Sequence, residues 1–201
     1  MVILPSTYLG SVEYFAHLAQ HGGECVVDIH EHYIKRSERN RSQIMTANGV
    51  MPLSVHVVNA NRPRTPMHKV CIDYSKRWQH QHWIAILSAY RSSPYFEHYA
   101  PFLEPFYTTH YNSLVEFNTA LTRQLMRLLG IEGELCLSES YIEALDSDTD
   151  LRIKKRESLF DSPRYFQMFS DRYPFEPNLS VIDLLFSEGP AAIDLLRRCR
   201  L

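Results

Sequence analysis

The stretch MVILPSTYLGSVEYFAHLAQHGGECVVD, residues 1–28, decides the fold class. Apolar runs at 2–4 and 25–27 have the length and composition of short buried strands. Between them, apolar residues recur at helical spacing after Ser11, a residue type that favours helix N-caps, and the glycine pair 22–23 ends the pattern. We therefore predict a β-α-β unit, which implies parallel strands joined by a crossover helix.

Further along, the pattern changes from strands to helices. Asn48-Gly49 between the β-prone runs 42–46 and 50–55 predicts a hairpin. Helical spacing predicts helices over 77–91, 95–103 and 112–129, a further helix beginning near Asp150, and two near the C-terminus separated by Gly189-Pro190. Ser180 and Asp183 form the pattern of a capping box. We predict an α/β fold in which the β-α-β unit and the hairpin form a mixed sheet covered by C-terminal helices.

Composition limits the class of protein. The 201 residues suit a single domain, 1–201, sheet-rich over 1–75 and helix-rich over 76–201. A net charge of −2 gives no general attraction to nucleic acid, and no run approaches the ~20 apolar residues of a membrane span. The four cysteines lie far apart, so neither a cysteine zinc site nor a disulfide scaffold is indicated. We expect a cytoplasmic protein with no membrane span and no nucleic-acid partner, and the sequence leaves its oligomeric state open.

The segment after the second strand carries the clearest candidate site. Four cations fall within seven residues, with Asn40 among them: Lys35, Arg36, Arg39 and Arg41. Guanidinium groups bind phosphate and carboxylate in a bidentate manner, so Arg39, Asn40 and Arg41 are candidate substrate-binding residues for a small anionic or phosphate-bearing molecule, and Lys35 is a candidate catalytic residue. The alternative is a charged loop that keeps an edge strand solvated.

An extended backbone from Asp28 would place Asp28, His30 and His32 on one strand face. Such a set could hold a transition metal or form an acid–base relay in which His30 or His32 is the base. An exposed polar sheet face explains the same pattern, and we assign neither a metal nor a cofactor.

Three residues on the predicted helices complete the candidates. His82 is a catalytic candidate, and Tyr90 and Asn118 are candidates for a pocket wall. Each could instead be a buried residue whose hydrogen bonds are satisfied in the core. The P-loop, dinucleotide-binding, nucleophile-elbow and zincin motifs are absent, which removes most support for those chemistries.

The chain resembles the WbqC-like proteins through an ordered set of short motifs that spans nearly its whole length: Pro5, Tyr14-Phe15, Tyr33-Ile34-Lys35-Arg36-Ser37, Arg39-Asn40-Arg41, Trp78-Gln79, His82-Trp83, Ala89-Tyr90, Ser93-Pro94-Tyr95-Phe96-Glu97, Asn118 and the run 178–186. The resemblance implies a role in bacterial surface-polysaccharide (O-antigen-type) biosynthesis, with acyl or aminoacyl transfer to a sugar as one suggested activity. It brings no established catalytic set. Ser42 stands where related members often carry cysteine, and His30 and His32 stand where they often carry acidic or amide residues.

Two functions from different classes follow. The first is a transferase acting on an amino sugar or a phosphate-bearing form of one, and the second is a non-catalytic binding or assembly protein of the same pathway. A metal-dependent enzyme is a third reading. If one site unites the candidates, the segment 35–41 lies against the helix 77–91, and His82 or Tyr90 faces the same cavity as Asn40 and Arg41.

Overall fold

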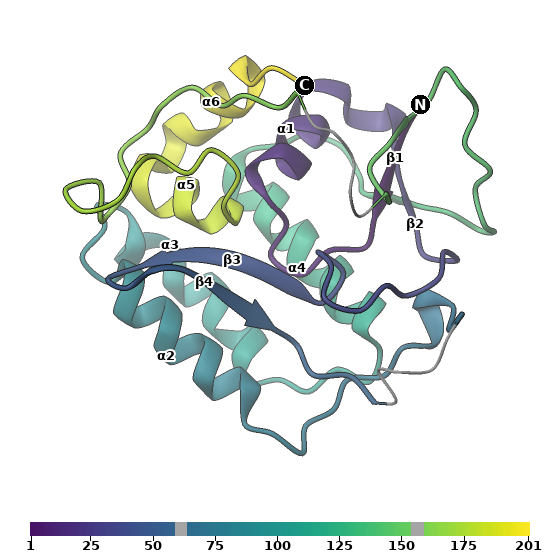
Figure 1. Ribbon diagram of the computed structural model, residues 1–201, viewed down its shortest axis with the longest axis horizontal. Coiled ribbons are helices and arrows are strands. Elements are labelled where there is room, and N and C mark those ends of the chain that lie inside the picture. Colours follow the sequence, from purple (N-terminus) through teal and green to yellow (C-terminus); the bar gives the residue numbers. More distant parts are fainter. Residues whose placement is uncertain (59–63, 154–158) are drawn as a thin grey trace.

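A computed structural model describes residues 1–58, 64–153 and 159–201. It contains a four-stranded parallel sheet with strand order β5-β2-β1-β6, of which β1 and β2 are labelled at the right of Figure 1. The strands are β1 Val2–Pro5, β2 Cys25–Asp28, β5 Cys136–Leu137 and β6 Thr149–Asp150. In the register of the two central strands, Val2 pairs with Cys25 and Pro5 with Asp28.

The predicted β-α-β unit is confirmed. The helix α1, Val12–His21, begins where the Ser11 hydroxyl accepts a hydrogen bond from the Tyr14 amide, and it ends at Gly22, whose φ of 49° suits glycine. All four residues of β1 are buried, since both faces of a parallel sheet are covered.

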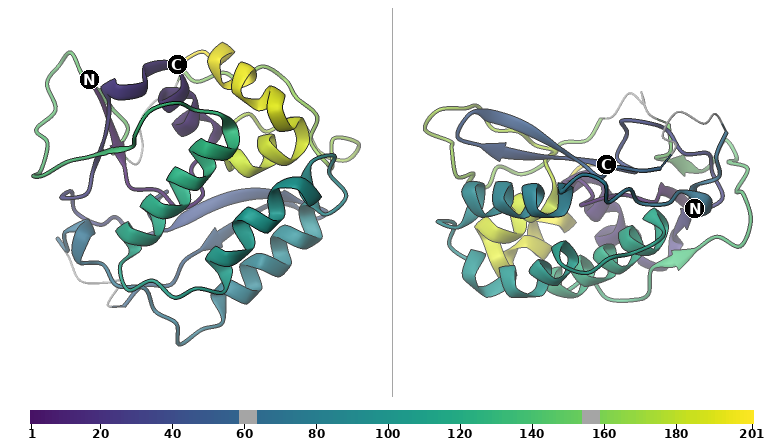
Figure 2. Two further views of the ribbon diagram at one scale, coloured as in Figure 1. Left: turned by 180° about the vertical axis from the view of Figure 1, so that it is seen from behind. Right: turned by 90° about the horizontal axis from the view of Figure 1, so that it is seen from below.

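The predicted hairpin is also confirmed, as β3 Arg41–Thr46 and β4 Gly49–Ser54. Its strands pair antiparallel with each other, and within the described residues they form a separate two-stranded sheet rather than extending the parallel one. The hairpin lies along α2, where the Met45 amide donates to the Tyr90 hydroxyl over 3.3 Å. Figure 2 shows it running across one side of the helical part of the molecule.

The remaining helices follow the predicted order, and the α/β class with helices in the C-terminal part is confirmed. They are α2 Trp78–Tyr90, α3 Phe96–Leu103, α4 Leu114–Leu129, α5 Val181–Glu188 and α6 Ala192–Arg198, with short 3-10 turns at Gly22–Glu24, Met67–Lys69, Glu104–Tyr107 and Gly189–Ala191.

Two local predictions are wrong. The residues around Asp150 form strand β6, paired with β1 through Val2 and Thr149, instead of starting a helix; residues 154–156 of that predicted helix lie outside the described residues. Ser180 and Asp183 do not form a capping box, because the Ser180 hydroxyl donates to the Leu9 carbonyl and Asp183 binds tyrosines.

Candidate functional site

The strand order creates a switch point next to β1. The chain leaves β1 through α1 to β2 on one side, whereas β6 reaches the other side of β1 from a distant part of the sequence. Open α/β sheets bind ligands outside the carboxyl ends of strands at such a point. A cavity of about 410 Å³ lies there, and its lining includes Pro5 at the end of β1 and Leu151 after β6.

Four segments build the wall of this switch-point cavity: Pro5 with residues 8–11, then 36–39 with 41–43, then 151–153, and then 176–180. The second segment includes most of the cation-rich loop that the sequence singled out. The fourth belongs to the run 178–186 that carries the family resemblance. The cavity therefore joins segments that are far apart in the sequence.

Two guanidinium groups of the lining have no acidic partner among the described residues. Arg41 is half-buried and donates from Nε to the Ser54 hydroxyl over 2.9 Å. Arg36 is exposed and has a φ of 56°, a left-handed conformation that is unusual for a residue other than glycine. Both remain able to bind an anion that enters the cavity.

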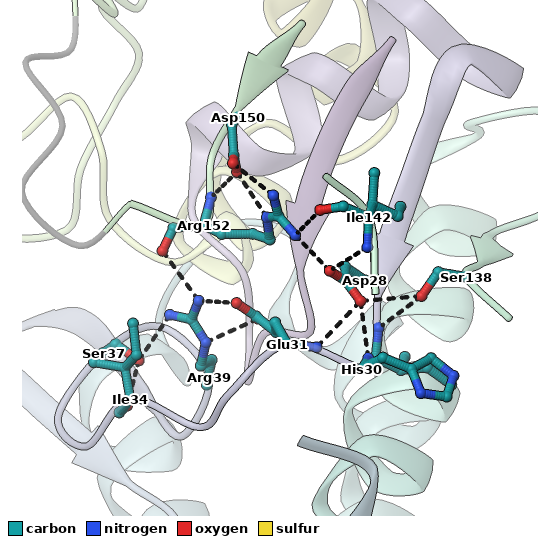
Figure 3. A network of polar contacts seen from close by, with 11 residues as sticks. Asp28, His30, Glu31, Ile34, Ser37, Arg39, Ser138, Ile142, Asp150 and Arg152 are labelled. Atoms are coloured by element: carbon teal, nitrogen blue, oxygen red, sulfur yellow. Dashed lines mark hydrogen bonds and ion pairs between the residues drawn. The ribbon is translucent and has the colours of Figure 1, made fainter. Parts of the chain in front are cut away.

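Arg39 is engaged differently. It is only 2% exposed, and it forms a buried bidentate ion pair with Glu31, in which Nε lies 2.8 Å from Oε1 (Figure 3). It also donates to the Arg152 carbonyl over 3.0 Å. Burial raises the pKa of Glu31 to about 7, and Arg39 opposes that rise. With its donors committed in this way, Arg39 holds the cation-rich segment against the sheet.

A second buried ion network lies beside the first. Arg152, just after β6, donates from Nη1 to Asp28 Oδ2 over 2.5 Å and from Nη2 to Asp150 Oδ2 over 2.7 Å (Figure 3). Asp28 is fully buried, and its Oδ1 accepts from the amides of His30 and Glu31 and from the Ser138 hydroxyl. The network ties the ends of β2 and β6 together.

The predicted strand face of Asp28, His30 and His32 is wrong, because β2 ends at Asp28 and the chain bends over residues 29–31. Asp28 accepts the His30 amide rather than its ring, and the His30 imidazole extends away from the network (Figure 3). That ring packs against His68 at 4.7 Å between centroids, while His32 is exposed. Across the described ranges, no group of three or more His, Cys, Asp or Glu side chains could hold a metal ion.

His82 is buried next to the cavity without lining it. Its Nδ1 lies 2.8 Å from the hydroxyl of Tyr8, which does line the cavity and also lies 3.1 Å from the Tyr107 hydroxyl. Burial, with a smaller effect of His56, lowers the pKa of His82 to about 4, and a hydrogen bond to the Ser54 backbone opposes the shift. His82 is thus neutral at neutral pH, and it connects to the cavity through Tyr8 and through Ser54, the partner of Arg41.

The other helix candidates are also buried outside the lining. Tyr90 donates to Asp183 Oδ1 over 2.8 Å, and Asp183 Oδ2 accepts from Tyr165 and Gln167. Burial raises the pKa of Asp183, although these three donors oppose the shift. The Tyr90 hydroxyl therefore links the hairpin to α5.

The two amide candidates, Asn118 and Asn40, make hydrogen bonds that hold the cation-rich segment in place. Asn118 donates to the Arg39 carbonyl over 2.8 Å, and Asn40 donates to the Val55 carbonyl over 3.0 Å. Lys35 is exposed and does not line the cavity. Of the residues predicted to bind substrate, the cavity thus brings Arg39 and Arg41 together, and the predicted convergence of Asn40 and Arg41 with His82 or Tyr90 in one cavity is wrong.

The N-terminus of α1 lies at the cavity, but its amides are already used by the protein. The Val12 amide donates to the Leu179 carbonyl over 2.9 Å, the Glu13 amide to Asn178 Oδ1 over 3.0 Å, and the Tyr14 amide to the Ser11 hydroxyl. In nucleotide-binding sheets, the corresponding amides bind phosphate. Here an anion would depend on arginine side chains instead.

The loop before α1 is held in a strained conformation. Leu9 has a φ of 47°, in the left-handed region, and its carbonyl accepts from the hydroxyls of Ser42 over 2.7 Å and Ser180 over 3.0 Å. The two hydroxyls come from the hairpin and from the start of α5. Ser42, the position where relatives often carry cysteine, is therefore in the cavity wall and has a structural contact.

Comparisons with known proteins agree with this picture of the chain. A model of the WbqC-like protein family matches residues 6–159. A Mycobacterium tuberculosis (strain ATCC 25618 / H37Rv) protein described as "Uncharacterized protein Rv1507c" is 30% identical over 198 residues, covering 84% of this chain and 85% of the relative. No solved structure matches the chain. Among the described residues, no helix is both long and apolar enough to span a membrane. The family match covers most of the chain and includes the cavity residues 8–11, 36–39 with 41–43, and 151–153, so the chain belongs to the WbqC-like protein family.

Proposed function

We propose that the switch-point cavity binds a small phosphate- or carboxylate-bearing molecule, and that the protein is a transferase of bacterial surface-polysaccharide biosynthesis. The observation that carries this proposal is the pair Arg36 and Arg41, two guanidinium groups in a cavity at the carboxyl edge of the sheet that have no acidic partner among the described residues. The family resemblance supplies the pathway and suggests acyl or aminoacyl transfer to a sugar.

The proposed roles follow from what each group can reach. Arg41 binds the anion directly, and Arg36 closes over it from the exposed side of the cavity. Arg39 and Asn118 hold the segment that carries both arginines. His82 positions Tyr8, whereas His30, His32 and Lys35 lie outside the lining and have no proposed contact with the substrate.

The Arg41→Ala variant tests the anion site, with glucose 6-phosphate as the probe and calorimetry as the measurement. Charge-assisted hydrogen bonds contribute about 1.5–3 kcal/mol, so we expect the affinity to fall about 10–100-fold. Arg91→Ala, a change at an exposed arginine after α2, is the matched control and should leave binding unchanged. Equal binding by wild type and Arg41→Ala would remove Arg41 from the site.

A non-catalytic binding protein of the same pathway is the second candidate. One observation favours it: within the part of the chain that the structure describes, no histidine or cysteine lines the cavity, so the lining lacks the commonest general base and thiol nucleophile. If substrate binding is normal but extracts supplied with candidate acyl and aminoacyl donors give no protein-dependent product, the binding function is the better account. Protein-dependent product would instead support the transferase.

A further inference from the structure

The switch-point cavity has charges of both signs, which bears on the ligand it selects. Besides Arg36 and Arg41, the lining includes the carboxylates of Glu38 and Glu176. No basic residue in the described ranges forms an ion pair with Glu176, which is only half-buried. A cavity made only for an anion would gain nothing from that carboxylate, because it weakens binding of the same charge.

The position of Glu176 is fixed by buried contacts. Gln167, 2% exposed, accepts the Glu176 amide at 3.0 Å and donates to the Glu176 carbonyl over 2.9 Å. The same Gln167 amide nitrogen donates to Asp183. The Asp183 network thereby fixes the backbone that carries the carboxylate, and Pro177 restricts it further.

The acidic and basic walls are joined directly. The Ser180 amide donates to the Gln43 carbonyl over 2.8 Å, so the segment 176–180 runs beside the first residues of β3. Arg41 begins that strand, and the exposed Gln43 adds an amide group to the lining, whereas the amide of Asn178 is used by Glu13. Opposite charges are therefore held on neighbouring walls of one cavity, with the neutral amide of Gln43 in the same lining.

The lining disfavours a nucleotide. Tyr8 is the one aromatic residue of the lining in the described ranges, and it is fully buried, so it offers no free ring face to a nucleobase. The α1 amides that would bind a diphosphate are occupied by Leu179, Asn178 and Ser11.

Taking the proposed anion site as given, we infer that the ligand is a zwitterion, an amino-sugar phosphate whose phosphate binds Arg36 and Arg41 and whose ammonium group binds Glu176. The ring hydroxyls then meet the exposed amide group of Gln43. A volume of about 410 Å³ is in the range of small-molecule sites and accommodates a phosphorylated monosaccharide.

Calorimetry with two matched probes tests this inference, since glucosamine 6-phosphate differs from glucose 6-phosphate by an ammonium in place of a hydroxyl. At pH 6.5 we expect the amino sugar to bind about tenfold more tightly, the size of one charge-assisted contact. Glu176→Gln should bring the ratio close to one without weakening glucose 6-phosphate. Glu97→Gln, at an exposed glutamate in the first turn of α3, should keep the tenfold ratio.

Each contrary outcome has its own meaning. If the wild type binds the two phosphates equally, or if Glu176→Gln still prefers glucosamine 6-phosphate, the inference of a zwitterionic ligand is overturned. The proposed anion site is not affected by either result. Absence of binding by both phosphates would overturn the anion site itself. L-alanine has both charges but no ring hydroxyls. If it binds more tightly than glucosamine 6-phosphate, the inference of an amino-sugar phosphate is overturned in favour of an α-amino acid.

Discussion

Asp28 and Asp183 are both fully buried, yet the protein accommodates the two carboxylates in different ways. Asp28 has a charged partner, Arg152, together with backbone amides and a serine hydroxyl. Within the described residues, the donors to Asp183 are all neutral, two tyrosine hydroxyls and one glutamine amide, and burial raises its pKa. One network supports the cavity at the parallel sheet, and the other supports it at the hairpin and α5. Because Asp28 relies on one counter-charge, the first network should lose most of its stability when Arg152 is removed. Because Asp183 shares several neutral donors, the second network should lose stability in smaller steps as donors are removed one at a time.

The strongest test of this difference is Arg152→Met. It leaves Asp28 buried without its counter-charge, so we expect a loss of about 3–5 kcal/mol in the free energy of unfolding, measured by urea denaturation. Arg172→Met is the control, because Arg172 pairs with Asp171 at the surface, where both side chains are more than 60% exposed. That control should cost under about 1 kcal/mol. Similar losses in the two variants would contradict the role given to Arg152.

Asp183→Asn changes the neutral network without removing a counter-charge. The asparagine NH2 group replaces one carboxylate oxygen and cannot accept a hydrogen bond, so it faces either the donors Tyr165 and Gln167 or the donor Tyr90. We therefore expect a loss of about 2–3 kcal/mol in the free energy of unfolding, measured by urea denaturation. The exposed Asp194→Asn on α6 should be nearly neutral. A loss as large as that of Arg152→Met would mean that a buried carboxylate with neutral donors is as sensitive to substitution as one with a counter-charge.

The Tyr8–His82–Tyr107 cluster is a third buried polar group, and its contribution to stability should depend on pH. The folded pKa of His82, about 4, lies below its unfolded value of 6.5, so the unfolded chain binds more protons between these values. Stability from neutral His82 is present above pH 6.5 and is lost as the pH falls toward 4, by about 3 kcal/mol at pH 4. His82→Asn removes the titration and retains an acceptor for Tyr8. Urea denaturation across this range should be flatter for the variant, and parallel curves would show that His82 does not titrate as described.

The smallest effects should come from removing one neutral donor on each side. Tyr165→Phe takes away one of three donors to Asp183, and we expect a loss of about 1–2 kcal/mol in thermal or urea unfolding. Ser138→Ala takes one donor from Asp28, which keeps Arg152 and its backbone amides, so the loss should stay below about 1 kcal/mol. A larger loss for Ser138→Ala than for Tyr165→Phe would contradict the difference described between the Asp28 and Asp183 networks.

Most of the fold could be predicted from local signals. Ser11 and Gly22 bound α1, Gly130 ends α4, and Asn48-Gly49 turns the hairpin, because each is a short-range steric or hydrogen-bonding preference. The strand β6 was missed because two residues, Thr149 and Asp150, have no periodicity and are defined only by pairing with β1.

The site was predicted less completely. The cation-rich segment was found, but which of its arginines are free depends on Glu31, whose place beside Arg39 follows from the bend after β2. Glu176, the proposed partner of the ammonium group, has no local signal, since its position depends on contacts with Gln167 and on the proximity of β3. Arg152 was read as part of a charged helix because the sequence does not reveal its pairing with Asp28.

The contact between Asn178 and Glu13 also sets the order in which the protein can mature on the ribosome. Besides the local cap from Ser11, the first turn of α1 uses Asn178, 165 residues after Glu13, as the acceptor for the Glu13 amide, and the last wall of the cavity is residues 176–180. A nascent chain can form the β-α-β unit early, because its contacts are close in sequence, but it cannot complete the switch-point cavity until nearly the whole chain has emerged. A chain that stops before residue 176 would lack both the Asn178 acceptor for the Glu13 amide and one wall of the cavity.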